Sequence, residues 1–197
     1  MNGQELLASL AEQNEGLLKT ADAVQAGVSR PTLAKFVEKN GYERIMRGVY
    51  YAPYAWVDRM YLLQMRWPTA IFSHETALFL QDMTDRDPLQ YTVTMKTGRN
   101  PSNLTNAGIC VYTVKEDLFS LGETTVKTVY GHDVRTYNVE RTVCDVVRSR
   151  NSMDGYIFTE ALKQYAQRKD KDLNRLMKYA KVFHVDSLVK QYMEVLL

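Results

Sequence analysis

The hydrophobic positions near the start of the chain repeat with the period of a helix. Residues 4–13 place Leu6, Leu7 and Leu10 three and four positions apart, which predicts an amphipathic helix. A second short helix is expected over residues 20–26, with Thr20 as its N-cap. Two short helices are therefore expected in the first 27 residues.

The next segment predicts a third helix with two unlike faces. Ser29 can cap it, and Pro31 suits its first turn, where the missing N–H costs nothing. The inward face holds the apolar residues and the outward face the polar ones: Leu33, Phe36 and Val37 inward, and Thr32, Lys35 and Lys39 outward. Two short helices joined by a tight turn, the second with an exposed cationic face, are typical of a helix-turn-helix that enters the major groove of DNA.

After Gly41 the pattern changes from helical spacing to alternation. Residues 42–51 are rich in β-prone side chains on both sides of Arg47-Gly48, which predicts a tight hairpin turned at that pair. A cationic hairpin directly after a recognition helix is a wing. Three short helices and a hairpin also occur in domains that never bind DNA. The distribution of charged residues is therefore needed to distinguish a DNA-binding domain from these others.

The charges of this region are divided along the chain. Residues 1–28 carry one basic and four acidic side chains, whereas residues 29–52 carry five basic and two acidic ones. The basic part coincides with the third helix and the hairpin, where DNA phosphates would lie. The residues expected to contact DNA are Thr20, Ser29, Arg30, Thr32, Lys35, Lys39, Arg44 and Arg47.

The remainder of the chain predicts a mixed architecture. Helical spacing of Trp56, Met60, Leu63 and Trp67 predicts a linking helix over residues 53–67 whose stripe is core. Three further kinds of segment are expected, namely strands at 90–95 and 109–114, a hairpin of 124–130 with 133–137, and helices from residue 156 to the end. The predicted fold class is α+β, with a winged helix-turn-helix domain in residues 1–52 and a larger mixed α/β domain in 53–197 that ends in a helical segment.

Composition excludes several classes of protein. Hydrophobic residues make up 45% and charged residues 24%, so extensive disorder is not expected. No apolar stretch approaches the roughly 20 residues of a membrane span, and no secretory signal is recognisable, so we expect a cytoplasmic protein without membrane contact. Cys110 and Cys144 are expected to be unpaired, buried small hydrophobes. The net charge of +2 is too small to suggest a nucleic-acid coat.

Candidate catalytic and metal-binding residues are few. Ser73-His74-Glu75 invites a hydrolase interpretation, but we expect adjacent helical residues to point in different directions, out of hydrogen-bond reach of one another. Arg141 and Asp145, four apart on a short helix, are expected to form a salt bridge rather than a functional pair. The three histidines have no metal-site spacing, and no Gly-rich phosphate loop occurs. We therefore expect no enzyme activity, no metal and no cofactor.

Three blocks of sequence resemble the AbiEi-type antitoxins. The residues from Leu33 to Gly41 and from Ile45 to Tyr51 look like the family's N-terminal winged helix-turn-helix. Ile71–Leu78 looks like its "SHeTAL" helix start, and Val139–Asp145 looks like its "ERTvcD" helix. The order and spacing of the three blocks are typical of the family, and the resemblance spans nearly the whole chain.

The resemblance implies a function in a bacterial two-gene toxin-antitoxin module linked to abortive phage infection. It implies autorepression by the N-terminal domain on inverted repeats in the module's own promoter. Because a single winged helix covers too few base pairs for high specificity, we expect paired half-sites and dimeric or cooperative binding to DNA. It also implies that the C-terminal domain neutralises a nucleotidyltransferase-like toxin encoded alongside, for which a stable complex is not assumed.

Two groups of cations are candidates for the antitoxin surface. The first is the pair Lys96 and Arg99, beside the loop of residues 100–103, and the alternative is a solvated loop. The second is Arg175, Lys178 and Lys181 on one helix face, which is either merely solvated or a surface for the toxin, its RNA target or flanking DNA.

Two other functional classes remain open from the sequence. One is a winged-helix transcription factor whose C-terminal domain senses a ligand or only dimerises. The other is a nuclease-like enzyme that carries a winged helix as a targeting module. No two acidic residues and a lysine stand in metal-nuclease spacing on the candidate strands, which disfavours the nuclease.

Overall fold

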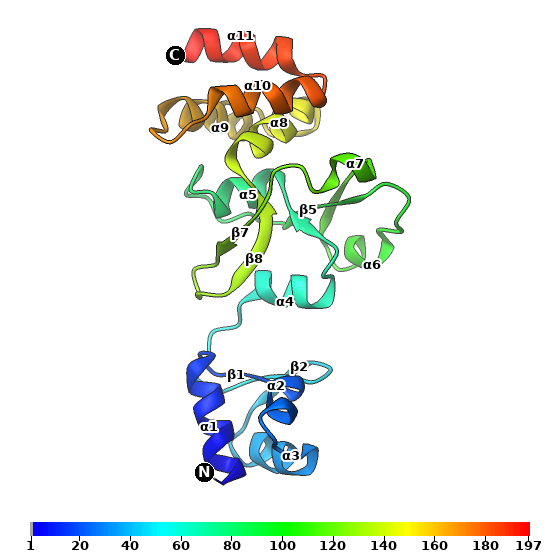
Figure 1. The fold of residues 1–197 in the computed structure, drawn as a ribbon, viewed down its shortest axis with the longest axis vertical. Helices are drawn as coiled ribbons and strands as arrows, with labels where there is room; N and C mark the ends of the chain where they lie inside the picture. The colour runs from blue at the N-terminus through cyan, green and yellow to red at the C-terminus, as the bar shows by residue number, and fades with distance from the viewer. Residues whose placement is uncertain (1) are drawn as a thin grey trace. The chain divides into compact units, whose positions relative to one another are not determined.

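The structure is a computed structural model that describes residues 2–197 and divides them into two compact units. The first unit ends at Asp58 and the second is Arg59–Leu197 (Figure 1). The sequence placed this boundary after residue 52 instead. The segment after β3 stays with the first unit because it packs on Gly16, where an added Cβ would lie 2.5 Å from that of Ala55 and 3.2 Å from that of Ala52.

The N-terminal unit contains three helices and a three-stranded antiparallel sheet. Its elements in chain order are α1 (Gly3–Gln13), β1 (Leu17–Lys19), α2 (Thr20–Gln25), α3 (Arg30–Lys39), β2 (Glu43–Met46) and β3 (Val49–Tyr51). The sheet order is β1-β3-β2, with Leu17 opposite Tyr51 and Lys19 opposite Val49. The three helices and the hairpin agree with the sequence prediction, whereas β1 was not predicted.

The core of this unit consists of side chains from all three helices. The residues of α1 that face it are Leu7 and Ala11, and α3 contributes all three predicted inward residues: Leu33, Phe36 and Val37. Each is less than 9% exposed, and burying a leucine, phenylalanine or valine side chain stabilises the folded state by about 1.5–3 kcal/mol. The opposite side of α3 is thereby turned to solvent.

The C-terminal unit is built on a five-stranded mixed sheet in the order β6-β5-β4-β8-β7. Its strands are β4 (Ile71–Phe72), β5 (Thr92–Lys96), β6 (Cys110–Val114), β7 (Glu123–Lys127) and β8 (Asp133–Tyr137). The pairs β4/β8 and β5/β6 are parallel, and the pairs β4/β5 and β7/β8 are antiparallel. The predicted strands and the hairpin are all present, and β4 was not predicted.

Helices complete the C-terminal unit. They are α4 (Arg59–Arg66), α5 (His74–Leu80), α6 (Ser102–Thr105), α7 (Glu116–Phe119), α8 (Val139–Arg148), the 3-10 helix η1 (Arg150–Ser152), α9 (Gly155–Gln167), α10 (Leu173–Val182) and α11 (Asp186–Leu196). The sheet separates two hydrophobic clusters. Ile71 points into a cluster shared with α5 and α8–α11, while Phe72 points into one shared with α4 and α6.

Two details of the predicted packing are wrong. The linking helix begins at Arg59, and Trp56, expected in its core stripe, precedes it and is 78% exposed. Met60, Leu63 and Trp67 do pack in the cluster beside α4. Both cysteines are free as expected, with Cys144 buried but Cys110 only half-buried.

Within residues 2–197 no helix combines the length and the apolar character needed to cross a bilayer.

Candidate nucleic-acid interface

Helix α3 presents a cationic face because its apolar side is used in the core. Ser29 caps it by accepting a hydrogen bond from the backbone N–H of Thr32 at 3.3 Å. Arg30, Lys35 and Lys39 are exposed. No described residue within 2–197 forms an ion pair with any of these three cations, so their charge is available to a ligand.

Thr32 does not share this outward stripe as the sequence suggested. Its hydroxyl lies 2.8 Å from Ser29 Oγ, and its methyl group faces the start of α1, where an added Cβ at Gly3 would lie 3.2 Å away. The side chain is half-buried. Thr32 and Ser29 therefore stabilise the beginning of α3, and the exposed stripe consists of the cations.

The β2–β3 hairpin adds two further exposed cations, Arg44 and Arg47. Gly48 completes the turn with φ of +76°, a conformation that favours glycine. The turn is fixed to α2, because the Thr20 backbone N–H donates to the Gly48 carbonyl at 2.8 Å. Thr20 is the first residue of α2 rather than its N-cap, which is Lys19, so its role here is to hold the hairpin.

The cations proposed for the antitoxin surface differ in how free they are. Lys96 Nζ forms an ion pair with Glu116 Oε1 at 2.6 Å and lies over the Phe119 ring, whereas Arg99 is exposed. The Lys96 partner holds the pKa of the Glu116 carboxyl below its usual value. Of this pair, Arg99 is the more accessible cation.

The cations of α10 also differ in whether they form ion pairs. Arg175 is within ion-pair distance of Glu140 (3.6 Å) and of Asp172 (3.4 Å), and the Glu140 side chain is only 5% exposed. Arg175 therefore links α10 to α8. Lys178 and Lys181 are exposed and form no ion pair with the residues described.

The sequence did not anticipate a buried polar cluster at the start of α5. His74 has φ of +48° and is 3% exposed; its ring lies 3.0 Å from Ser73 Oγ and 3.0 Å from Ser149 Oγ, and stacks on Tyr112 with centroids 3.5 Å apart. The expectation that Ser73 and His74 lie out of reach of each other is thus wrong. Ser73 does not cap α5 with its side chain; its Oγ accepts from Thr94 Oγ1 at 2.9 Å.

Burial determines the chemistry of this cluster. Burial lowers the pKa of His74 to about 3, helped by the nearby charges of Arg141 and Arg148. Ser73 is fully buried, so no substrate reaches its hydroxyl in this conformation. Arg141 and Asp145 form the predicted salt bridge, with Nε 3.0 Å from Oδ2 and both side chains buried.

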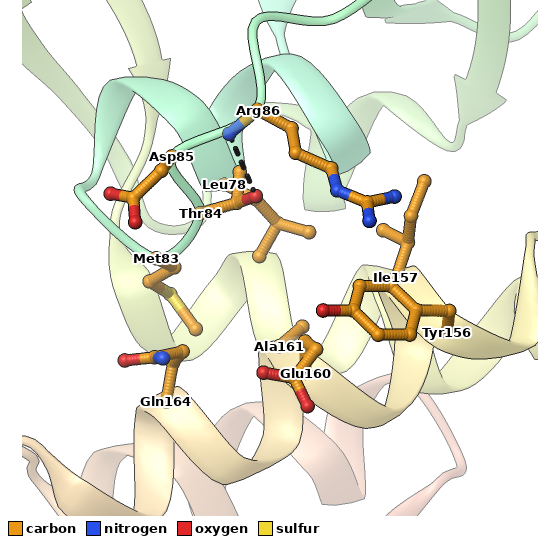
Figure 2. A pocket seen from close by; sticks show the side chains of 10 residues that line it. All are labelled: Leu78, Met83, Thr84, Asp85, Arg86, Tyr156, Ile157, Glu160, Ala161 and Gln164. Carbon is orange, nitrogen blue, oxygen red and sulfur yellow. Dashed lines mark hydrogen bonds between the residues drawn. The ribbon is translucent and has the colours of Figure 1, made fainter.

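A separate hollow of about 140 Å³ lies beside α5 and α9 (Figure 2). Its wall is apolar at Leu78 and Ile157, and the Arg86 guanidinium lies 4.4 Å from the centre of the Tyr156 ring. Because Arg86 and Glu160 bring both signs of charge to it, the lining favours no ligand class. Among the described residues no group of three His, Cys, Asp or Glu side chains could hold a metal ion.

Comparison with known proteins bears on the N-terminal unit. Residues 5–53 match the family described as a transcriptional regulator, AbiEi antitoxin. The resemblance to AbiEi-type antitoxins is confirmed over these residues. The match includes most of α1 and all of the other five elements of the unit, and so includes the cations of α3 and of the hairpin. No curated protein matches the sequence.

Among solved structures, the chain is similar to the RV2827C protein from Mycobacterium tuberculosis. The TM-score is 0.62 at 13% sequence identity, and the similarity covers 95% of this chain and 75% of that chain. At this identity the similarity shows a shared fold and nothing about function.

Proposed function

We propose that the chain is an antitoxin and a DNA-binding transcriptional autorepressor, with an N-terminal unit that acts as a winged helix-turn-helix. The observation that carries this proposal is the set of exposed cations on α3 and on the β2–β3 hairpin, within the residues that match the antitoxin regulator family. In such an arrangement α3 enters the major groove and the hairpin contacts the adjacent backbone.

The operator consists of inverted repeats in the chain's own promoter. A single winged helix covers too few base pairs for high specificity, so two copies bind paired half-sites, as a dimer or cooperatively. Because its ligand is the chromosome, the protein acts in the cytoplasm.

The C-terminal unit counteracts a nucleotidyltransferase-like toxin encoded alongside and so controls abortive phage infection. A stable complex with the toxin is not required by this proposal. The function needs neither catalysis nor a cofactor in this chain, and the family description names a regulator and an antitoxin rather than an enzyme.

Footprinting on the chain's own promoter tests the DNA-binding half of the proposal. The protein should protect two related half-sites, and the double variant Arg44→Ala/Arg47→Ala should lose protection at moderate salt. The matched control Lys115→Ala/Lys169→Ala removes the same charge from exposed positions outside the N-terminal unit and should footprint normally. A single unrepeated site, or equal footprints from all three proteins, would contradict it.

Co-expression with the product of the adjacent gene tests the antitoxin half. The chain, supplied from a foreign promoter, should restore growth of cells that express that gene. Growth arrest that persists at full expression of folded chain would contradict it.

A further inference from the structure

A small cavity of about 20 Å³ lies within the polar cluster of the C-terminal unit. Four elements contribute to its polar lining. They are α5 through His74, β5 through Thr94, β6 through Tyr112, and α8 through Arg141, Asp145 and Arg148. The volume is that of about one water molecule, which is also the size of one oxygen of an oxyanion. The cavity is not sealed, because Arg148 and Thr113 in its lining are exposed.

Arg141 has one hydrogen-bond donor without a partner at this cavity. Its Nε donates to Asp145, and its Nη1 donates to the carbonyls of Leu118 and Leu121 at 2.9 and 2.7 Å. Its Nη2 is buried and has no partner among residues 2–197. Nε and Nη2 share one edge of a guanidinium group, so Nη2 lies on the side of Asp145, which also lines the cavity.

The side chain cannot turn to satisfy this donor elsewhere. The guanidinium carbon lies 4.1 Å from the centre of the Tyr137 ring and 4.2 Å from that of Phe183. Gly122 packs so closely that an added Cβ would lie 2.6 Å from Arg141 Cβ. A buried charged donor without a partner destabilises the folded state more than a neutral one does, so an acceptor atom in the cavity is strongly favoured.

The charges around the cavity favour an anion as the source of that acceptor. Arg141 and Arg148 are both cationic, and both disfavour the protonated form of His74, which stays neutral. The opposing carboxylate, Asp145, is already engaged by Arg141 Nε. Two cations and one occupied carboxylate leave a positive excess that a water molecule does not balance.

We propose that this cavity binds one oxygen of a phosphate group, with Arg141 Nη2 as the buried donor and Arg148 holding the rest of the anion at the mouth. This site is separate from the proposed DNA interface, since all of its residues belong to the C-terminal unit. The phosphate site and the proposed function can therefore be tested independently of each other.

Phosphate titration of the full chain, monitored by calorimetry and thermal melting, tests the site. Sodium phosphate should bind and raise the melting temperature, and sodium chloride at equal ionic strength should not. Arg141 variants are expected to unfold, so the test uses variants of the two exposed lining residues, Arg148 and Thr113. Arg148→Gln should weaken phosphate binding about tenfold, and Thr113→Glu should abolish it. Lys169→Gln, an exposed charge change outside the cavity, should bind as the unaltered chain does.

The source of the phosphate is distinguished by three probes, namely inorganic phosphate, adenosine 5′-monophosphate against adenosine, and a 5′-hydroxyl oligoribonucleotide. Binding of the first alone indicates the free ion. Tighter binding of the second indicates a nucleotide, and Arg148-dependent binding of the third indicates a nucleic-acid backbone. If no probe binds in an Arg148-dependent way, or if chloride stabilises as well as phosphate, the proposal is overturned and the cavity holds water only.

Discussion

Individual side chains on α3 and the hairpin should divide the work of DNA binding. Lys35, in the exposed stripe of α3, is placed to reach base edges, whereas Arg47 at the hairpin turn is placed to bind phosphate. Lys35→Ala should therefore relax sequence preference. Arg47→Ala should weaken binding to all sequences and reduce the salt slope by about one unit. Gel shifts with operator and random DNA across a salt series measure both, and the same loss for both variants on both DNAs would rule out this division.

Gly122 should be among the least replaceable glycines of the C-terminal unit. Gly122→Ala adds a methyl group against Arg141 Cβ at a residue with φ of +77°, so we expect unfolding to become easier by about 2–4 kcal/mol. Gly108→Ala is the matched control, because φ is +78° but nothing lies within 4 Å of the added atom. It should cost only about 1 kcal/mol. Denaturant melts compare the two, and equal losses would show that the close approach to Arg141 is unimportant.

His74 should make the stability of the C-terminal unit depend on pH. The folded-state pKa is about 3, below the ordinary value of 6.5, so the unfolded chain binds the extra proton between these limits. Stability is therefore complete above about pH 6.5 and falls as the pH is lowered toward 3, by up to about 1.4 kcal/mol per pH unit. Asparagine tolerates the left-handed backbone conformation of residue 74. His74→Asn should therefore remove the part of the pH dependence of the unfolding free energy that is due to His74. Parallel slopes for both proteins in denaturant melts from pH 7 to 4 would contradict this.

At the residue scale the sequence predicted types of side chain better than their contacts. Leu33, Phe36 and Val37 are buried as expected because a period of 3.6 fixes the face of a helix. Thr32 was misplaced by the same spacing rule, because its hydroxyl bonds Ser29 and its methyl faces α1. Contacts between elements cannot be derived from the spacing within one of them.

At the scale of elements, helices with caps were predictable and very short strands were not. Ser29 caps α3 as expected, by accepting from the N–H of Thr32 at 3.3 Å. β1 and β4 have three and two residues, too few to show an alternating pattern. They are strands because β1 pairs with β3 and β4 pairs with β5, contacts that no local pattern reveals. The polar cluster at His74 was missed for a related reason, since it joins α5, β5, β6 and α8, which are far apart in sequence.

Helix α10 offers a test of the antitoxin surface that separates fold from function. Arg175→Gln should lower stability by up to about 1 kcal/mol, because Arg175 bridges to Glu140 on α8. Lys178→Gln/Lys181→Gln should leave the melting temperature nearly unchanged, because neither lysine has an ion-pair partner among the described residues. The double variant should nevertheless reduce rescue from the toxin. If it melts normally and rescues fully, this face is only solvated, and Arg99 becomes the next residue to replace.

At the scale of the whole molecule, repression and neutralisation should be separable at Asp58. A fragment of residues 59–197 keeps the five-stranded sheet and both of its hydrophobic clusters, so it should fold alone. It should protect cells from the toxin when supplied from a foreign promoter, yet fail to repress its own promoter. A fragment that began at Pro53 would carry six additional residues that belong to the first unit. Circular dichroism confirms folding, and a folded fragment that gives no protection would show that neutralisation needs the N-terminal unit as well.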